Sequence, residues 1–211
     1  MKIAVVAASG RSGKVFVERA LAAGHSVRAG VHTASNLDPH PQLSVEVCDA
    51  TQQDDVLNLL DGQEVVVSFI GHVKGSPDHV QTDAMRTLAV AMQAKNITRL
   101  VSLTGTGVRF AGDKITLVDW VLNAGIAMID PARIRDGKDH VAFLQQTDLN
   151  WTVLRVLKLQ NVKPTPFSLN QNGPTKWFVG REEVADAVLQ VLEQRSFIRQ
   201  APIISPKPHL T

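Results

Sequence analysis

The chain has 211 residues, 44% of them hydrophobic, and a formal net charge of +2 with histidine neutral. This length and content predict one globular domain spanning residues 1–211, and the small net charge gives no indication of nucleic-acid or membrane binding. The one cysteine, Cys48, excludes an internal disulfide framework and a multi-cysteine zinc site. No apolar run is long enough to span a bilayer. We therefore expect a soluble, cytoplasmic protein without a metal site.

The first 24 residues predict a strand, a glycine turn and a helix. Residues 3–7 form a short, continuous apolar run, which is typical of a strand buried on both faces. The run leads into AASGRSG, after which residues 14–23 place apolar residues at helical spacing before Gly24. Free backbone N–H groups at such a helix start attract the diphosphate of a nucleotide. The alternative is a tight turn that binds nothing.

Strands and helices continue to alternate along the chain. Further strands are expected at 25–31, 43–47, 64–70, 100–103 and 151–157, with a last edge strand at 202–205. Helices are expected from the Thr51 N-cap to residue 60, then to about residue 95, and at 114–129, 134–146 and 182–193. This order predicts an α/β fold: a Rossmann-like, doubly wound parallel sheet flanked by helices, with a small C-terminal substrate-side region.

Ligands of open parallel sheets bind beyond the carboxyl ends of the strands. Six separate segments are therefore expected to meet there: 7–13, 31–35, 49–50, 70–74, 104–106 and 155–158. The glycine turn keeps Gly10, which lets backbone approach phosphates, and Gly13, which lets the helix pack close to the strand. Ala7 stands where a three-glycine turn would have its first glycine.

The end of the second strand bears on the choice of cofactor. An acidic residue there, about twenty positions beyond the turn, would bind the ribose hydroxyls of NAD. The segment VHTASN has no carboxylate that would repel a 2′-phosphate, and His32 can donate a hydrogen bond to one. No arginine is present for a bidentate contact. We favour NADP, with NAD as the alternative; His32 can equally be an exposed loop histidine.

A family resemblance rests on an ordered series of segments: IAVVAASGRSG, VHTAS, CDATQQDDV, VVVSFIG, LVSLTGTG, LNWTVLRV and FVGREEVADAVLQ. The series resembles the atypical short-chain dehydrogenases, and is closest to the NAD(P)H-binding group that contains NmrA-like proteins and biliverdin reductase B (flavin reductase). The resemblance covers nearly the whole chain and is weakest at 109–134. Val156 departs from it, because an Arg-Pro pair is common after the sixth strand.

The resemblance implies a role for each matching residue. The phosphates would be bound by Ser9, Gly10, Arg11, Ser12 and Gly13. The 2′-position would be met by His32, the adenine by Asp49 and Ala50, and the nicotinamide ribose by Ile70, Gly71 and Thr104. His32 replaces the arginine usual in NADP-binding members.

The chain has no tyrosine, which excludes the Tyr-x-x-x-Lys proton donor of typical short-chain dehydrogenases. Thr104 is the candidate catalytic residue, but a hydroxyl without a lowered pKa is a poor general acid. Its expected role is to hydrogen-bond ribose or substrate, unless it simply ends the strand. The missing acid favours an NAD(P)H-dependent reductase of a flavin- or quinone-like acceptor. The alternative is a non-catalytic, NmrA-type redox-sensing regulator that binds NAD(P).

For the other candidate residues, an ordinary structural role is the alternative to a functional one. His72 and Lys74 can reach phosphates or substrate, or simply face solvent. Asp136 and His140 can pair, most simply as an i,i+4 contact on a helix surface, and Cys48 is more typical of a buried small residue than of a nucleophile. Trp120, with Leu117, Val118, Val121 and Leu122, can form an apolar lid, core packing or a subunit interface. The expected ligand is a small molecule, with a protein partner or homo-oligomer as further options.

Overall fold

The computed structural model describes residues 1–33, 36–73 and 75–207. Within them, eight strands form one sheet in the order β3-β2-β1-β4-β5-β6-β10-β8. These strands are β1 (Lys2–Val6), β2 (Ser26–Val31), β3 (Leu43–Val47), β4 (Val65–Ser68), β5 (Arg99–Gly105), β6 (Asn150–Val156), β8 (Phe167–Asn170) and β10 (Ile203–Pro206). All neighbours are parallel except β8, which runs antiparallel to β10. Two short strands, β7 (Leu159–Gln160) and β9 (Val179–Gly180), pair separately.

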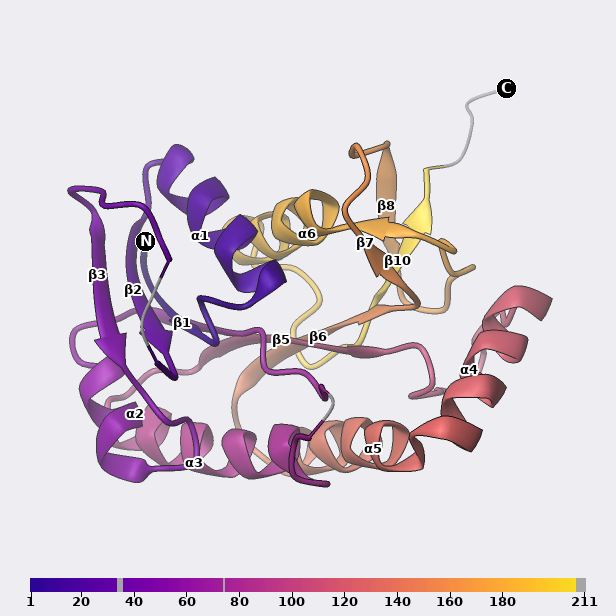
Figure 1. Ribbon diagram of the computed structural model, residues 1–211, viewed down its shortest axis with the longest axis horizontal. Coiled ribbons are helices and arrows are strands. Elements are labelled where there is room, and N and C mark those ends of the chain that lie inside the picture. Colours follow the sequence, from indigo (N-terminus) through magenta and orange to yellow (C-terminus); the bar gives the residue numbers. More distant parts are fainter. Residues whose placement is uncertain (34–35, 74, 208–211) are drawn as a thin grey trace.

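Helices cover both faces of this sheet (Figure 1). One face carries α1 (Arg11–Ala22) and α6 (Arg181–Glu193), and the other carries α2 (Gln53–Leu59), α3 (Val80–Ala94) and α5 (Pro131–Gln145). Helix α4 (Leu117–Ile129) leads into the start of α5 and lies away from both layers. The predicted Rossmann-like, doubly wound fold is confirmed. Among the described residues, no helix combines the length and apolar character needed to cross a bilayer.

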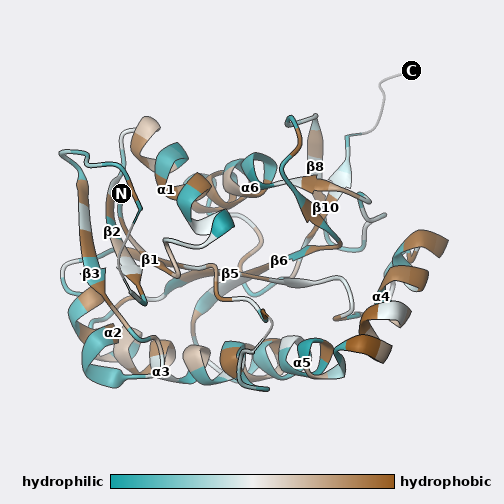
Figure 2. Ribbon diagram, in the orientation of Figure 1, coloured by the Kyte–Doolittle hydropathy of each residue, from teal (hydrophilic) through white to brown (hydrophobic). Residues whose placement is uncertain are grey.

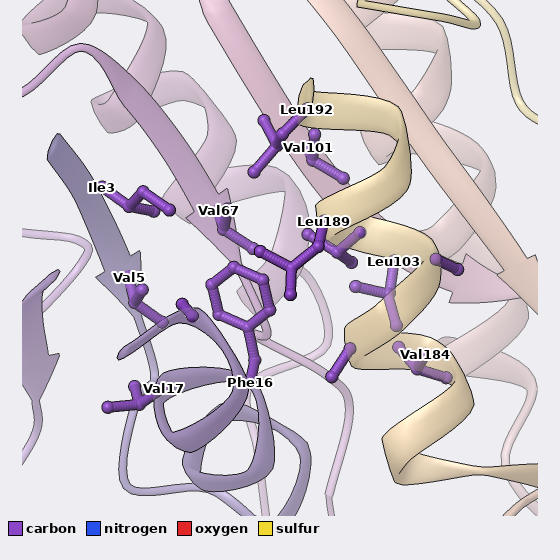
Figure 3. Close-up of a cluster of buried hydrophobic side chains, with 14 of the residues drawn as sticks. Ile3, Val5, Phe16, Val17, Val67, Val101, Leu103, Val184, Leu189 and Leu192 are labelled. Atoms are coloured by element: carbon purple, nitrogen blue, oxygen red, sulfur yellow. The ribbon is translucent and has the colours of Figure 1, made fainter. Parts of the chain in front are cut away.

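The continuous apolar strands follow from burial on both faces of the sheet. Ile3 and Val5 of β1 belong to the core beneath α1 and α6, whereas Ala4 and Val6 belong to the core on the opposite face. Phe16 of α1 is fully buried in the first core (Figure 3). Burying such a side chain contributes about 1.5–3 kcal/mol, so packing on both sides fixes the register of the central strands.

Three predictions of local structure were wrong. Residues 203–206 form β10, which is not an edge strand because β8 pairs with its outer side. Thr51 does not cap α2: Gln52 occupies that position, and the Thr51 hydroxyl donates to Asp49 instead. Helix α4 begins at Leu117, three residues later than expected, where the Thr116 hydroxyl accepts a hydrogen bond from the Asp119 N–H.

Candidate functional site

A cavity of about 480 Å³ lies at the carboxyl ends of β1, β4, β5 and β6. Four of the six segments expected to meet contribute to its lining: Arg11 and Ser12; Ile70, Gly71 and His72; Thr104 and Gly105; and Val156, Leu157 and Lys158. Helices α4 and α5 add an apolar wall of Leu122, Ile126 and Ile134. The parallel topology thus gathers residues that are distant in sequence around one cavity of small-molecule size.

The glycine turn is held tightly beneath the start of α1. Ala7 has a φ of 59°, a left-handed conformation that favours glycine, and its carbonyl accepts a hydrogen bond from the Gly10 N–H at 3.1 Å. A Cβ on Gly13 would lie 2.3 Å from the same carbonyl oxygen, so only glycine fits there. The first N–H groups of α1 have no acceptor within the helix, so this end of the site is suited to an anion.

The hydroxyl of Thr104 is available to a ligand. Thr104 is 6% exposed and lines the cavity, and no group in the described part of the chain hydrogen-bonds to its Oγ1. A Cβ on Gly137 would lie 2.6 Å from that Oγ1, so this glycine of α5 leaves the space the hydroxyl occupies. Nearby, the Gln81 side-chain amide donates to the carbonyls of Ile70 and Leu103 at 2.9 and 3.1 Å, which ties the ends of β4 and β5 together.

His72 is engaged by its neighbours. Its Nε2 donates to the Pro77 carbonyl at 3.1 Å, and its Nδ1 lies 3.5 Å from a carboxylate oxygen of Asp130. These contacts join the loop after β4 to the start of α5, so the ring has a structural role at the edge of the cavity. Lys74, the second candidate in this loop, lies outside the described residues.

The ionisable side chains that line the cavity are all basic: Arg11, His72, Arg133, Lys158 and Arg181. No carboxylate or thiol belongs to its described lining, and the chain has no tyrosine. Within the described residues there is also no cluster of three or more histidine, cysteine, aspartate or glutamate side chains that could hold a metal. The site can therefore attract an anionic ligand, and offers no carboxylic acid, thiol or phenol as a proton donor.

The residues assigned to the adenosine half lie outside this cavity. His32, at the end of β2, is exposed, whereas Ala50 is buried. Asp49 accepts hydrogen bonds from the Thr51 N–H and hydroxyl at 2.9 and 2.7 Å. These bonds, with a smaller effect of the His32 charge, hold the pKa of Asp49 below its usual value. Ala34 and Ser35 lie outside the described residues.

A second cavity of about 410 Å³ also borders the glycine turn. Ser9, Gly10 and Arg11 line it, together with Lys14 and Asn36. Gly13 is buried beneath the turn and lines neither cavity. The predicted phosphate-binding residues therefore surround the start of α1, and Arg11 borders both cavities.

Three further candidates have structural roles. Asp136 is fully buried rather than on a surface, and its carboxylate accepts hydrogen bonds from the Gln81 N–H at 2.8 Å and the Thr82 N–H at 3.0 Å. His140 is also buried, and its Nε2 lies 3.0 Å from the Ser102 hydroxyl. Burial, with smaller effects of Asp55 and Asp49, raises the pKa of Cys48 to about 11, so this thiol is unreactive near neutral pH.

Arg181 and Gln81 were not among the residues predicted for the site. Gln81 gave no signal, because nothing in the sequence places a helix residue between two strand ends. Arg181 gave a faint one: Gly180–Arg181 at the start of α6 repeats Gly10–Arg11 at the start of α1. The importance of this repetition becomes visible only when the two helix starts are seen to border the same cavities.

Fold and site together define a nucleotide-binding protein of the Rossmann class. The family model described as NAD(P)H-binding matches residues 7–195, and the chain belongs to this family. This membership confirms the predicted resemblance and establishes the cofactor class as NAD(P)H.

Solved structures with the same fold carry several functional names. A candidate NADH-flavin reductase from Streptococcus pneumoniae TIGR4 is 20% identical, with a TM-score of 0.80 over 98% of this chain and 100% of that one. A short-chain dehydrogenase/reductase from Veillonella parvula DSM 2008, solved in complex with NADP, is 18% identical, with a TM-score of 0.79 over 99% and 95% of the chains. A candidate epimerase from Bacteroides thetaiotaomicron is 18% identical, with a TM-score of 0.80 over 100% and 99%. At these identities the likeness shows the fold alone.

Proposed function

We propose that this protein is an NADPH-dependent reductase of a small conjugated acceptor of the flavin or quinone type. The observation that carries the proposal is the composition of the 480 Å³ cavity: an apolar wall, a free Thr104 hydroxyl, and no carboxylic acid, thiol or phenol in the described lining. The apolar wall suits a flat conjugated ring, and the basic side chains around it suit an anionic group of the cofactor or acceptor. Membership of the NAD(P)H-binding family supports the cofactor.

The residues present fit the cofactor and limit the chemistry. Gly13 lets α1 begin directly against the turn, because a Cβ there would meet the Ala7 carbonyl oxygen. The Thr104 hydroxyl, which has no partner among the described residues, can hold a ribose or acceptor oxygen. When bound, the reduced nicotinamide supplies a hydride. A conjugated acceptor takes up this hydride into its ring system, and solvent supplies the accompanying proton. The protein then needs only to bind, orient and partly exclude water, which its side chains can do without a general acid.

The preference for NADPH rests on the end of β2. Val31 is followed by exposed His32 and Thr33, with no carboxylate to repel a 2′-phosphate. A histidine N–H and a threonine hydroxyl can each donate to phosphate oxygens. We therefore assign His32 to the 2′-phosphate.

The second candidate function is a non-catalytic regulator that binds NAD(P) and reports redox state to a protein partner. The lack of a carboxylic acid, thiol or phenol in the described lining of the cavity favours it as much as it favours a reductase. The exposed apolar residues of α4 offer a surface for a partner. Catalytic turnover separates the two functions.

The test is a fluorescence titration with NADPH and NADH, followed by oxidation assays with riboflavin, FMN and a soluble quinone. We expect NADPH to bind more tightly than NADH, and to be oxidised when an acceptor is added. Tight binding of NADPH without oxidation by any acceptor would eliminate the reductase and favour the regulator.

A further inference from the structure

Two helices that are far apart in sequence begin beside one another with the same dipeptide. Helix α1 begins after Gly10 with Arg11, and α6 begins after Gly180 with Arg181. Arg11 and Arg181 both line the 480 Å³ cavity and the 410 Å³ cavity. Two helix N-termini and two guanidinium groups therefore converge on the boundary between the cavities, and both features favour negative charge.

The arginine of α6 is held in place but incompletely bonded. Arg181 is 9% exposed, and its Nη1 donates to the Asn161 side-chain oxygen at 2.5 Å. Its Nε is buried and has no hydrogen-bond partner among the described residues. A buried guanidinium N–H without an acceptor is costly, so the Nε marks a place where an acceptor is missing.

Glu18 and Glu182 border the second cavity with the two arginines, but no carboxylate among the described residues forms an ion pair with either arginine. Burial and, to a smaller extent, the like charge of Arg11 lower the pKa of Arg181. Glu182, next in the chain, is bonded to Arg19 instead, and Glu183 turns back to accept hydrogen bonds from Lys176 and the Gly180 N–H.

We propose that Arg11 and Arg181 form a clamp for one anionic group of a bound ligand, with Arg181 closing it from the side opposite the glycine turn. The group is a phosphate or carboxylate, and either the cofactor diphosphate or an anionic acceptor can supply it. This inference deepens the proposed function and rests on it for the identity of the ligand. It assigns to α6, the most C-terminal helix, a direct part in binding.

The test compares Arg181→Gln and Arg181→Lys with the control Arg19→Gln, which removes an arginine from the same α1–α6 contact but outside both cavities. Binding of NADPH is followed by fluorescence, and acceptor use by the Michaelis constants of FMN and riboflavin, which differ by a phosphate. If the cofactor supplies the anion, Arg181→Gln raises the Kd for NADPH about tenfold or more. If the acceptor supplies it, the constant for FMN rises while that for riboflavin does not.

Either result supports the clamp, provided that Arg19→Gln leaves both constants unchanged and Arg181→Lys recovers part of the binding. The clamp is overturned if Arg181→Gln alters neither constant, or if Arg19→Gln alters them equally. Failure of the clamp is distinguishable from failure of the reductase function. If the wild-type protein binds NADPH but never oxidises it, the reductase function is wrong. Weaker NADPH binding by Arg181→Gln would still support the clamp in that case.

A second, independent observation concerns α4, whose polarity is inverted. Its buried residues are the polar Asp119 and Asn123, whereas large apolar side chains point outward. Asp119 accepts hydrogen bonds from Arg109, Asn123 and Thr175, which anchor the helix. Hydrophobic colouring covers much of α4 (Figure 2). We define the α4 face by its exposed apolar residues and the adjoining Ile115: Ile115, Leu117, Trp120, Val121, Met128 and Ile129.

We infer that the α4 face binds a second copy of this chain. Burying one large apolar side chain removes on the order of 100 Å² from water, so six supply most of the roughly 800 Å² per partner of a stable interface. The only charged residue within α4 that the structure describes, Asp119, is fully buried. A two-fold pairing therefore brings no like charges of α4 together. A helix lying on a lipid surface would instead carry lysine or arginine on an exposed polar face.

Sedimentation velocity tests this interface. We expect a dimer for the wild-type protein and a monomer for Trp120→Glu and Met128→Glu, two changes at exposed positions that leave the circular dichroism spectrum unchanged. Val90→Glu, at an exposed position on α3, should remain dimeric. A monomeric wild-type protein, with or without binding to anionic vesicles, would overturn the inference. Equal dissociation by Val90→Glu would overturn it as well.

Discussion

The glycine turn depends on the close approach of Gly13 to the carbonyl oxygen of Ala7. Gly13→Ala would place a Cβ 2.3 Å from the Ala7 oxygen, a contact with backbone that cannot be relieved by a side-chain movement. We expect a loss of unfolding free energy of about 1–3 kcal/mol and a clear rise in the Kd for NADPH. Chemical denaturation and fluorescence titration measure the two effects. A variant that binds NADPH as the wild type does would contradict this account of the turn.

Ala7→Gly is the matched change at the other end of the turn. Ala7 occupies the left-handed region, where a Cβ costs roughly 1–2 kcal/mol. Replacing it by glycine removes this cost, but the greater freedom of glycine in the unfolded chain offsets part of the gain in stability. We expect a small increase in unfolding free energy, with NADPH binding retained. Denaturant titration of both proteins provides the measurement; a marked loss of stability would show that the Ala7 side chain is needed.

Because His140 is buried, we expect the protein to lose stability in mild acid. Burial lowers its pKa to about 4 from the ordinary value of 6.5, with a smaller opposing effect of Asp136. Between these values the unfolded chain binds a proton that the folded protein does not, so unfolding free energy falls as the pH falls from about 6.5 to 4, by about 3 kcal/mol. Denaturation across this range should show a shallower pH dependence for His140→Gln. An unchanged slope would argue against a buried neutral imidazole.

The sequence predicted which residues matter better than it predicted how deeply they are buried. The i,i+4 spacing of Asp136 and His140 correctly put them near one another on α5, but spacing cannot tell a surface face from a buried one. Ala7 stands where the glycine pattern has its first glycine, but only the structure shows that its backbone is left-handed. Thr104 was predicted from its strand end, while the space around its hydroxyl depends on Gly137, from a different element.

Among the elements, the C-terminal part of the sheet depends on a buried ion pair. Arg155 of β6 is fully buried, and its guanidinium donates to both carboxylate oxygens of Asp113 at 2.5 and 3.0 Å. Asp113→Asn leaves the arginine without its counter-charge and should cost about 3–5 kcal/mol of unfolding free energy. Thermal and chemical denaturation report the change. The matched control, Asp61→Asn, removes an exposed partner of Lys95 and should be indistinguishable from the wild type.

The elements of the first half could be predicted because each central strand is buried on both faces and reads as an apolar run. The strands β7, β8 and β9 escaped prediction for a physical reason. β7 and β9 have two residues each, and all four residues of β8 are half-buried. Such segments become strands through the partners that tertiary structure supplies. The apolar sequence of α4 predicted a helix but not which side faces outward, because Asp119 finds its partners in distant segments.

Across the whole molecule, the proposed cofactor site extends from the end of β2 to the cavity beyond β5. His32→Asp places a carboxylate at the end of β2, where it should repel a 2′-phosphate and accept hydrogen bonds from ribose hydroxyls. We expect the ratio of the Kd for NADPH to that for NADH to rise at least tenfold, measured by parallel fluorescence titrations. His40→Asp, at another exposed loop histidine, is the control. An unchanged ratio would mean that His32 does not meet the 2′-position.

We propose that NADPH transfers a hydride in a cavity whose described lining offers no carboxylic acid, thiol or phenol as a proton donor. The most direct test of this transfer is anaerobic stopped-flow mixing of the protein with FMN and with NADPH deuterated at the transferred position. We expect NADPH absorbance to fall in step with flavin reduction and deuterium to slow both signals. We expect Thr104→Val to weaken binding without abolishing transfer. No flavin reduction above the rate without protein, while NADPH remains bound, would contradict the proposal.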